Sequence, residues 1–89
     1  MLSKYRKQID KIDKRIVRLF EKRMDISKCV GEYKKENNIE IFDAEREMEI
    51  INTRTSQIKN PEYEEYAKEF FNNLMCISKK CITKSKGKL

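Results

Sequence analysis

The chain has 89 residues, of which 38% are hydrophobic and 40% are charged, with a formal net charge of +6, so we expect one small domain with a thin core. No apolar run approaches the roughly 20 residues of a membrane span, and the N-terminus lacks the apolar centre of a signal peptide, which predicts a cytoplasmic location and no membrane partner. Two glycines and one proline among many Lys, Glu, Ile and Arg residues favour long helices over strands, so the predicted fold class is all-α.

The N-terminal third predicts one long helix with an apolar seam. Nine positions recur with 4,3 spacing, which is typical of a coiled-coil-like helix, and eight of them are apolar or aromatic. These seam positions are Tyr5, Ile9, Ile12, Ile16, Leu19, Arg23, Ile26, Val30 and Tyr33. The helix can run from about Ser3 to Glu36, where Asn37 and Asn38 end it.

Such a helix would be roughly 50 Å long, whereas a compact domain of this size is only about 30 Å across. The first helix therefore extends beyond its own subunit. Only a second copy can bury the whole seam, so we expect an intertwined homodimer in which the N-terminal half of this helix reaches across to the partner.

Two shorter helices are predicted to follow. Asp43 can cap the start of the second, which continues to about Ile58. Asn60 and Pro61 form a typical helix start, and the third helix again carries apolar residues at 4,3 spacing. These residues are Tyr63, Ala67, Phe70, Leu74, Ile77 and Cys81. We expect three helices within a domain of residues 1–82, followed by a lysine-rich tail at residues 83–89.

Composition also narrows the chemistry. Cys29, Cys76 and Cys81 lack metal-ligand spacing, and the chain has no histidine, so we expect reduced thiols and neither a metal site nor a catalytic nucleophile. The positive net charge is compatible with binding to nucleic acid, an anionic membrane or an acidic small molecule. Because no nucleic-acid recognition motif is present, we expect no nucleic-acid partner.

One cation interrupts the apolar seam of the first helix. The guanidinium of Arg23 would lose hydration there, at a cost of several kcal/mol unless an anion pairs with it. Lys34 lies three turns further along nearly the same face. Arg6 lies about 25 Å from Arg23 along the helix, so both can reach one small molecule only across an antiparallel dimer. A salt bridge or a side chain that reaches solvent would also satisfy Arg23.

The later helices add polar groups that fit a plain bundle less well. Arg46 accompanies the acids Asp43 and Glu47 at the start of the second helix, where an ordinary helix start favours acids alone. Ser78 lies on an apolar stripe of the third helix. For Asp43 a simple cap, and for Ser78 a hydrogen bond to its own helix backbone, remain alternatives to ligand binding.

Over about residues 2 to 82, the order of these residues resembles the AroQ class of chorismate mutases, the all-helical type. Arg6 lies in the segment Tyr-Arg-Lys-Gln-Ile-Asp-Lys-Ile-Asp, which is similar to the opening pattern of the family. Arg23 follows, and Lys34 comes three residues after Gly31, as in the family. The most specific part is the segment 42–47, Phe-Asp-Ala-Glu-Arg-Glu, which is similar to the family's Asp-x-x-Arg-Glu signature.

The resemblance implies three helices per chain, two entwined chains and two active sites, each built from both subunits. The implied reaction is the [3,3] rearrangement of chorismate to prephenate in the shikimate pathway, towards phenylalanine and tyrosine. It needs no metal, cofactor or covalent intermediate.

The resemblance also assigns roles by matching positions. Arg6 from the other subunit and Arg23 would bind the two substrate carboxylates, and Lys34 would contact the ether oxygen, where negative charge grows in the transition state. Glu47 would complete the catalytic set near the substrate hydroxyl. The remaining substrate-binding positions would be Asp43 near the hydroxyl, Arg46 supporting the pocket, Ser78 on the ring carboxylate, and Ile82.

Ile82 departs from the family pattern. The family carries Gln, or sometimes Glu, at this position, and that side chain donates a second hydrogen bond to the ether oxygen. Isoleucine cannot donate, and loss of one such donor costs about 3 kcal/mol in some enzymes, so we expect reduced activity. Two other functions stay open: an isochorismate-pyruvate lyase, which shares the fold and a similar cationic pocket, and a weakly active or non-catalytic regulatory module.

Overall fold

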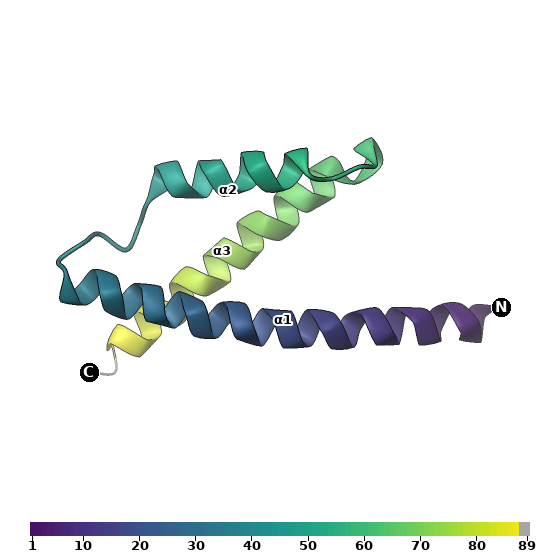
Figure 1. Ribbon diagram of the computed structural model, residues 1–89, viewed down its shortest axis with the longest axis horizontal. Coiled ribbons are helices and arrows are strands. Elements are labelled where there is room, and N and C mark those ends of the chain that lie inside the picture. Colours follow the sequence, from purple (N-terminus) through teal and green to yellow (C-terminus); the bar gives the residue numbers. More distant parts are fainter. Residues whose placement is uncertain (88–89) are drawn as a thin grey trace.

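The computed structural model describes residues 1–87 and the side chains of residues 1–83. Within this part, the chain forms three α-helices and one 3-10 turn, without a strand, which confirms the predicted all-helical class. The elements are α1 (Leu2–Glu36), α2 (Ala44–Ser56), η1 (Pro61–Tyr63) and α3 (Glu64–Gly87), as Figure 1 shows. None of these helices combines the length and apolarity that a membrane crossing needs.

Helix α1 begins and ends within one residue of the prediction. Asn37 caps its C-terminus, and the Asn37 side chain donates a hydrogen bond to the Tyr33 carbonyl at 2.8 Å. Asn38 then takes a left-handed conformation with φ of 56°, which asparagine tolerates better than most residues, and this turns the chain away. With 35 residues, α1 is about 52 Å long, and it accounts for the longest dimension of the molecule, 53 Å.

Side-chain caps also begin the next two elements. A carboxylate oxygen of Asp43 accepts a hydrogen bond from the Arg46 amide at 3.0 Å, as predicted. Helix α2 ends at Ser56, two residues before the predicted end. Asn60 caps a 3-10 turn, after which α3 continues to Gly87, five residues into the predicted tail segment 83–89. Residues 88 and 89 of that segment lie outside the described residues.

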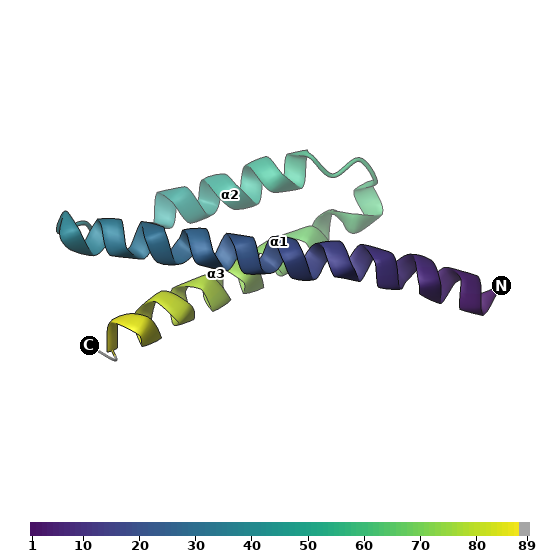
Figure 2. The same ribbon diagram turned by 60° about the horizontal axis from the view of Figure 1, so that its bottom comes forward.

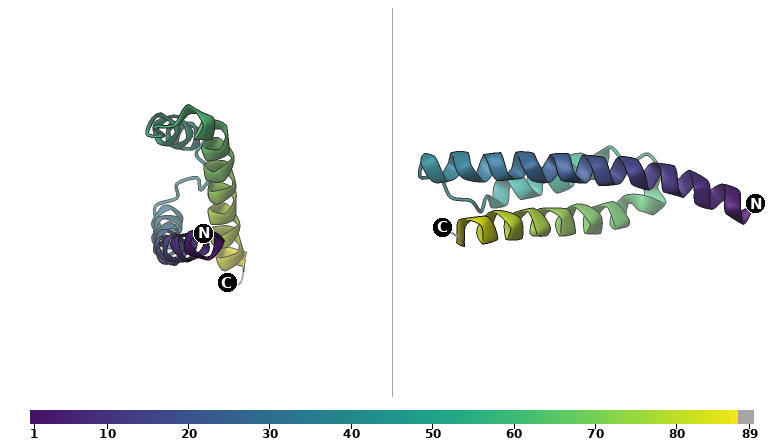
Figure 3. Two further views of the ribbon diagram at one scale, coloured as in Figure 1. Left: turned by 90° about the vertical axis from the view of Figure 1, so that its right-hand side faces the viewer. Right: turned by 90° about the horizontal axis from the view of Figure 1, so that it is seen from below.

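The three helices form an open arrangement with α3 at its centre. Helices α1 and α2 each pack against α3, whereas no packing between α1 and α2 is found in the described chain. Viewed end on, α1 and α2 lie on the same side of α3 (Figure 3). The N-terminal end of α1 extends beyond α3 and has no neighbouring helix among residues 1–87 (Figures 1 and 2).

The core of the single chain is very small. Its buried hydrophobic residues, among those described, are Ile50 of α2 and Leu74 and Met75 of α3. The seam of α1 is open, and Leu19 for example is 63% exposed. Beside this seam, α1 and α3 form an apolar groove of about 600 Å³, and Phe20 is one of the residues that line it. The radius of gyration, 16.0 Å, exceeds the roughly 12 Å of a compact domain of this length.

Candidate functional site

Arg23 is bound to α3 by a hydroxyl group. Its Nη1 donates a hydrogen bond to Ser78 Oγ at 2.9 Å, and Ser78 Oγ donates to the Leu74 carbonyl at 3.0 Å. Ser78 is only 8% exposed, so this pair lies inside the α1–α3 contact. The backbone bond expected of a structural serine is therefore present, and the same oxygen also accepts from Arg23. Among the described side chains, no carboxylate forms an ion pair with Arg23.

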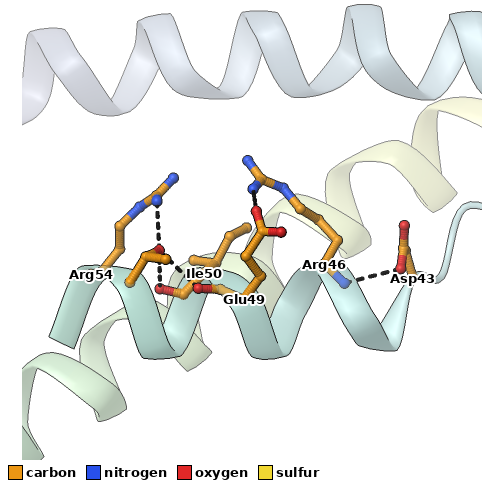
Figure 4. Close-up of polar contacts among 6 residues, drawn as sticks. Asp43, Arg46, Glu49, Ile50 and Arg54 are labelled. Atoms are coloured by element: carbon orange, nitrogen blue, oxygen red, sulfur yellow. Dashed lines mark hydrogen bonds and ion pairs between the residues drawn. The ribbon is translucent and has the colours of Figure 1, made fainter. Parts of the chain in front are cut away.

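The surroundings of Arg23 are positively charged. Burial lowers the pKa of its guanidinium, and the charges of Arg54 and then Arg46 lower that pKa further. Figure 4 shows Arg46 and Arg54 projecting from α2 towards α1, with Ile50 between them on the helix. Arg46 pairs with Glu49, whereas Arg54 donates to the hydroxyl of its neighbour Thr53 at 2.9 Å. Because the neighbouring arginines repel the charge of Arg23, an anion beside Arg23 would interact favourably with all three.

Arg54 was not among the residues singled out from the sequence. Arg46, Ile50 and Arg54 are spaced four residues apart, so they lie along one side of α2, and this spacing is the signal that could have found Arg54. The spacing alone does not say that this side of α2 faces Arg23. That fact depends on how α2 packs against α3.

Lys34 lies near the end of α1, where it fastens the connecting segment. Its Nζ donates a hydrogen bond to the Ile41 carbonyl at 3.2 Å, and the side chain is half-buried. An ammonium group carries three donors, so two remain for other acceptors. Lys34 is therefore held in place while it keeps the capacity to bind an anion.

The start of α2 places two carboxylates differently. The Asp43 carboxylate serves as the helix cap, as the simpler reading of the sequence predicts. The Glu47 carboxylate faces α3, where both of its oxygens lie 3.2 Å from Lys79 Nζ. Lys79 is the second residue of this region that the sequence analysis missed. Its contact with Glu47 depends on how α2 and α3 pack together, which the sequence does not show.

The last two predicted site residues lie at opposite ends of the molecule. Ile82 packs on α1 at Gly31, one turn before Lys34, so closely that a Cβ atom on Gly31 would lie 2.7 Å from Ile82 Cγ2. Arg6 is exposed on the free N-terminal half of α1, about 25 Å along the helix from Arg23. A single chain therefore brings Ser78, Arg46 and Arg54 near Arg23, whereas Arg6 lies far from them.

Cysteines and acidic residues offer little for metal binding in the described chain. Cys29, Cys76 and Cys81 are free thiols, and the first two are exposed. No group of three or more Cys, Asp or Glu side chains in residues 1–83 is arranged to hold a metal ion.

Comparisons with known proteins agree with the resemblance seen in the sequence. A family model described as chorismate mutase type II matches residues 5–81. Over 50 residues the chain is 45% identical to the bifunctional chorismate mutase/prephenate dehydratase of Aquifex aeolicus (strain VF5). This match covers 56% of the chain and 14% of that protein, so the chain corresponds to a small part of its relative. No solved structure matches the chain.

Proposed function

Since the chain belongs to the family of type II chorismate mutases, we propose that it rearranges chorismate to prephenate in the biosynthesis of aromatic amino acids. The observation that carries this proposal is the half-buried Arg23, which has a hydroxyl partner and two arginines nearby but no carboxylate ion pair in the described chain. A dianionic substrate such as chorismate would supply the missing negative charge. The relative from Aquifex aeolicus, whose name includes chorismate mutase, supports the same activity.

The proposed mechanism uses positioning and electrostatics. Cations that hold both carboxylates fix the flexible enolpyruvyl arm over the ring, which replaces a rare conformation in solution with a bound one. As the carbon–oxygen bond breaks, negative charge grows on the ether oxygen. Lys34 has two hydrogen-bond donors beyond the one that binds Ile41, and we assign it the stabilisation of that oxygen. Glu47 and Asp43 take the side of the substrate hydroxyl.

We further propose that the active form is an intertwined homodimer in which Arg6 from the other subunit completes each site. Two features support this. The seam of α1 is exposed in the single chain, which would leave an unusually large apolar stripe in water. The groove beside Phe20 is lined almost entirely by apolar side chains of α1 and α3, so it suits the apolar seam of a second α1.

Ile82 bears on the rate of the proposed reaction. It lies beside the turn of α1 that carries Lys34, and its side chain has no donor. The family match ends at residue 81, immediately before it. We propose that the ether oxygen therefore receives one electrostatic contact where relatives provide two, and that turnover is correspondingly slower.

The test is a product assay on the purified protein with chorismate and with isochorismate in separate reactions. We expect prephenate from chorismate, and we expect Arg23→Gln to abolish most of this turnover. Arg18→Gln is the matched control, because Arg18 is an exposed arginine of the same helix. Release of pyruvate from isochorismate alone would identify a lyase instead. No product from either substrate would favour a regulatory module.

A further inference from the structure

One ammonium group joins three parts of the molecule beside the site. Lys79 Nζ of α3 lies 3.2 Å from both Oε1 and Oε2 of Glu47 on α2. The same nitrogen lies 5.0 Å from the centroid of the Phe42 ring, in the segment that leads into α2. The other two ion pairs of the described side chains each join residues three apart on one helix. Only the Lys79–Glu47 pair among them links two helices.

The geometry of this contact fixes the Glu47 carboxylate without using up its acceptors. A carboxylate offers about four lone-pair positions, so two equal contacts to one ammonium leave positions open for a hydroxyl donor. The Glu47 and Lys79 side chains are 28% and 38% exposed, so water surrounds the pair less than it surrounds an ordinary surface pair. Phe42, itself 60% exposed, covers the ammonium with the negative face of its ring.

Lys79 follows Ser78 on α3, and the two neighbours act on opposite helices. Ser78 holds Arg23 of α1, while Lys79 holds Glu47 of α2. Consecutive residues of one helix thus hold a cation of α1 and a carboxylate of α2. We propose that Lys79 is a positioning residue, which holds Glu47 in the orientation that accepts the substrate hydroxyl. This inference rests on the proposed function.

A double-mutant cycle on the full chain tests the inference with chorismate as the substrate. Lys79→Met keeps the length of the side chain and removes its charge. In the otherwise unmodified protein we expect kcat/KM to fall about tenfold, the effect of one charge-assisted hydrogen bond. In a Glu47→Gln background the same change should alter kcat/KM by less than about twofold, because the partner that Lys79 positions is already gone.

Two further variants separate positioning from general stability. Lys79→Arg restores a cation that can bind both carboxylate oxygens, and it should recover most of the lost kcat/KM. Lys80→Met is the matched control, because Lys80 is the exposed neighbour on α3 and forms no ion pair with the described side chains; it should leave kcat/KM unchanged. Circular dichroism checks that each variant folds, and Lys79→Gln replaces Lys79→Met if the latter does not.

The outcomes distinguish the two proposals. Equal losses in both backgrounds, from an active wild type, would show that Lys79 acts independently of Glu47 and would overturn the positioning role alone. A gain in activity for Lys79→Met would show that the ion pair with Lys79 keeps Glu47 from binding the substrate. This result would also overturn the positioning role. If the unmodified protein turns over no chorismate, the proposed function fails and the positioning role falls with it.

Discussion

The role of Arg54 can be judged from its position relative to Arg23. Both are partly buried, and neither forms an ion pair with a described carboxylate. An arginine near the end of α2 could simply interact with the helix dipole, which is worth about 0.3–1 kcal/mol. Arg54 points towards α1 in Figure 4 and its charge lowers the pKa of Arg23, so we propose that Arg54 attracts the anionic substrate instead.

We therefore expect Arg54→Gln to raise the KM for chorismate about threefold to tenfold with a smaller change in kcat, because a cation beside Arg23 would attract the dianionic substrate in the ground state and the transition state alike. The KM of Arg54→Lys should lie between those of the unmodified protein and Arg54→Gln. Steady-state kinetics at low and high salt would measure the effect, which should shrink as salt screens the charge. An unchanged KM together with a lower melting temperature would assign Arg54 to the helix end.

Ile82 leads to a prediction of opposite sign, a gain of activity. Its side chain packs at Gly31, one turn from Lys34, so a longer amide at this position could reach the same region. We expect Ile82→Gln to raise kcat by at least about tenfold, with a smaller effect on KM, because the added hydrogen bond strengthens as charge develops on the ether oxygen.

Some stability should be lost in Ile82→Gln, since a polar amide replaces a packed aliphatic side chain. Ile82→Leu serves as the control, because it changes shape without adding a donor. Stopped assays of prephenate formation and thermal unfolding measure both effects. A rate that stays the same or falls, in a protein that remains folded, would mean that position 82 does not face the reacting atoms.

Helix boundaries were predictable where local chemistry sets them. Asn37, Asp43 and Asn60 each bond to nearby backbone groups, as their side chains predict, so the end of α1 and the start of α2 were found. Pro61, the predicted first residue of the third helix, begins a 3-10 turn instead, and α3 starts at Glu64. The end of α2 has no glycine or proline beside it, and its prediction ran two residues too far. Contacts between residues of different helices leave no pattern in the nearby sequence from which they could be predicted. The pairing of Lys79 with Glu47, 32 residues away in sequence, followed only from the packed fold.

The crossing of α1 and α3 depends on one glycine. A Cβ on Gly31 would meet Ile82 Cγ2 at 2.7 Å and Cγ1 at 3.3 Å, and a β-branched side chain has few rotamers with which to move away. In a free helix, Gly→Ala would add roughly 1 kcal/mol of stability. We expect Gly31→Ala to destabilise the protein by about 1–3 kcal/mol instead, because the helices must separate.

The effect of Gly31→Ala on stability should change sign once the Ile82 side chain is shortened. In an Ile82→Ala background, Gly31→Ala should be neutral or stabilising, since only the helix propensity then remains. Denaturant unfolding of the four proteins measures both steps. If Gly31→Ala destabilises equally in both backgrounds, another contact than Ile82 sets the close approach of α1 and α3.

At the scale of the whole molecule, the open seam of α1 predicts the assembly. A chain whose described hydrophobic core consists of Ile50, Leu74 and Met75 has little to stabilise it alone. We expect sedimentation equilibrium at micromolar concentration to give about twice the chain mass of 10.8 kDa. Leu19→Glu, in the exposed seam, should weaken association and unfold the chain, whereas Arg18→Gln should change neither. A stable, folded monomer would contradict this prediction.

The final prediction concerns which subunit supplies each arginine of a site. Arg6 and Arg23 lie about 25 Å apart on one helix, and Arg6 is exposed. If each site combines Arg23 of one subunit with Arg6 of the other, Arg6→Ala and Arg23→Ala should each abolish most turnover in homodimers. A mixed dimer with one mutation in each chain has one site that contains both wild-type arginines, and a second site that lacks both.

After subunit exchange of the two variants at equal concentration, about half of the dimers are mixed, so activity should recover to about a quarter of the wild-type level. Differently tagged chains allow the mixed dimer to be isolated and its exchange verified. The control mixes Arg23→Ala with Arg18→Ala, where every site that receives Arg23 already contains Arg6, so activity should simply follow the share of Arg18→Ala chains. If verified mixed dimers of the first pair stay inactive, Arg6 and Arg23 cannot serve one site from different subunits, because a site confined to one chain would carry one of the two mutations in every case.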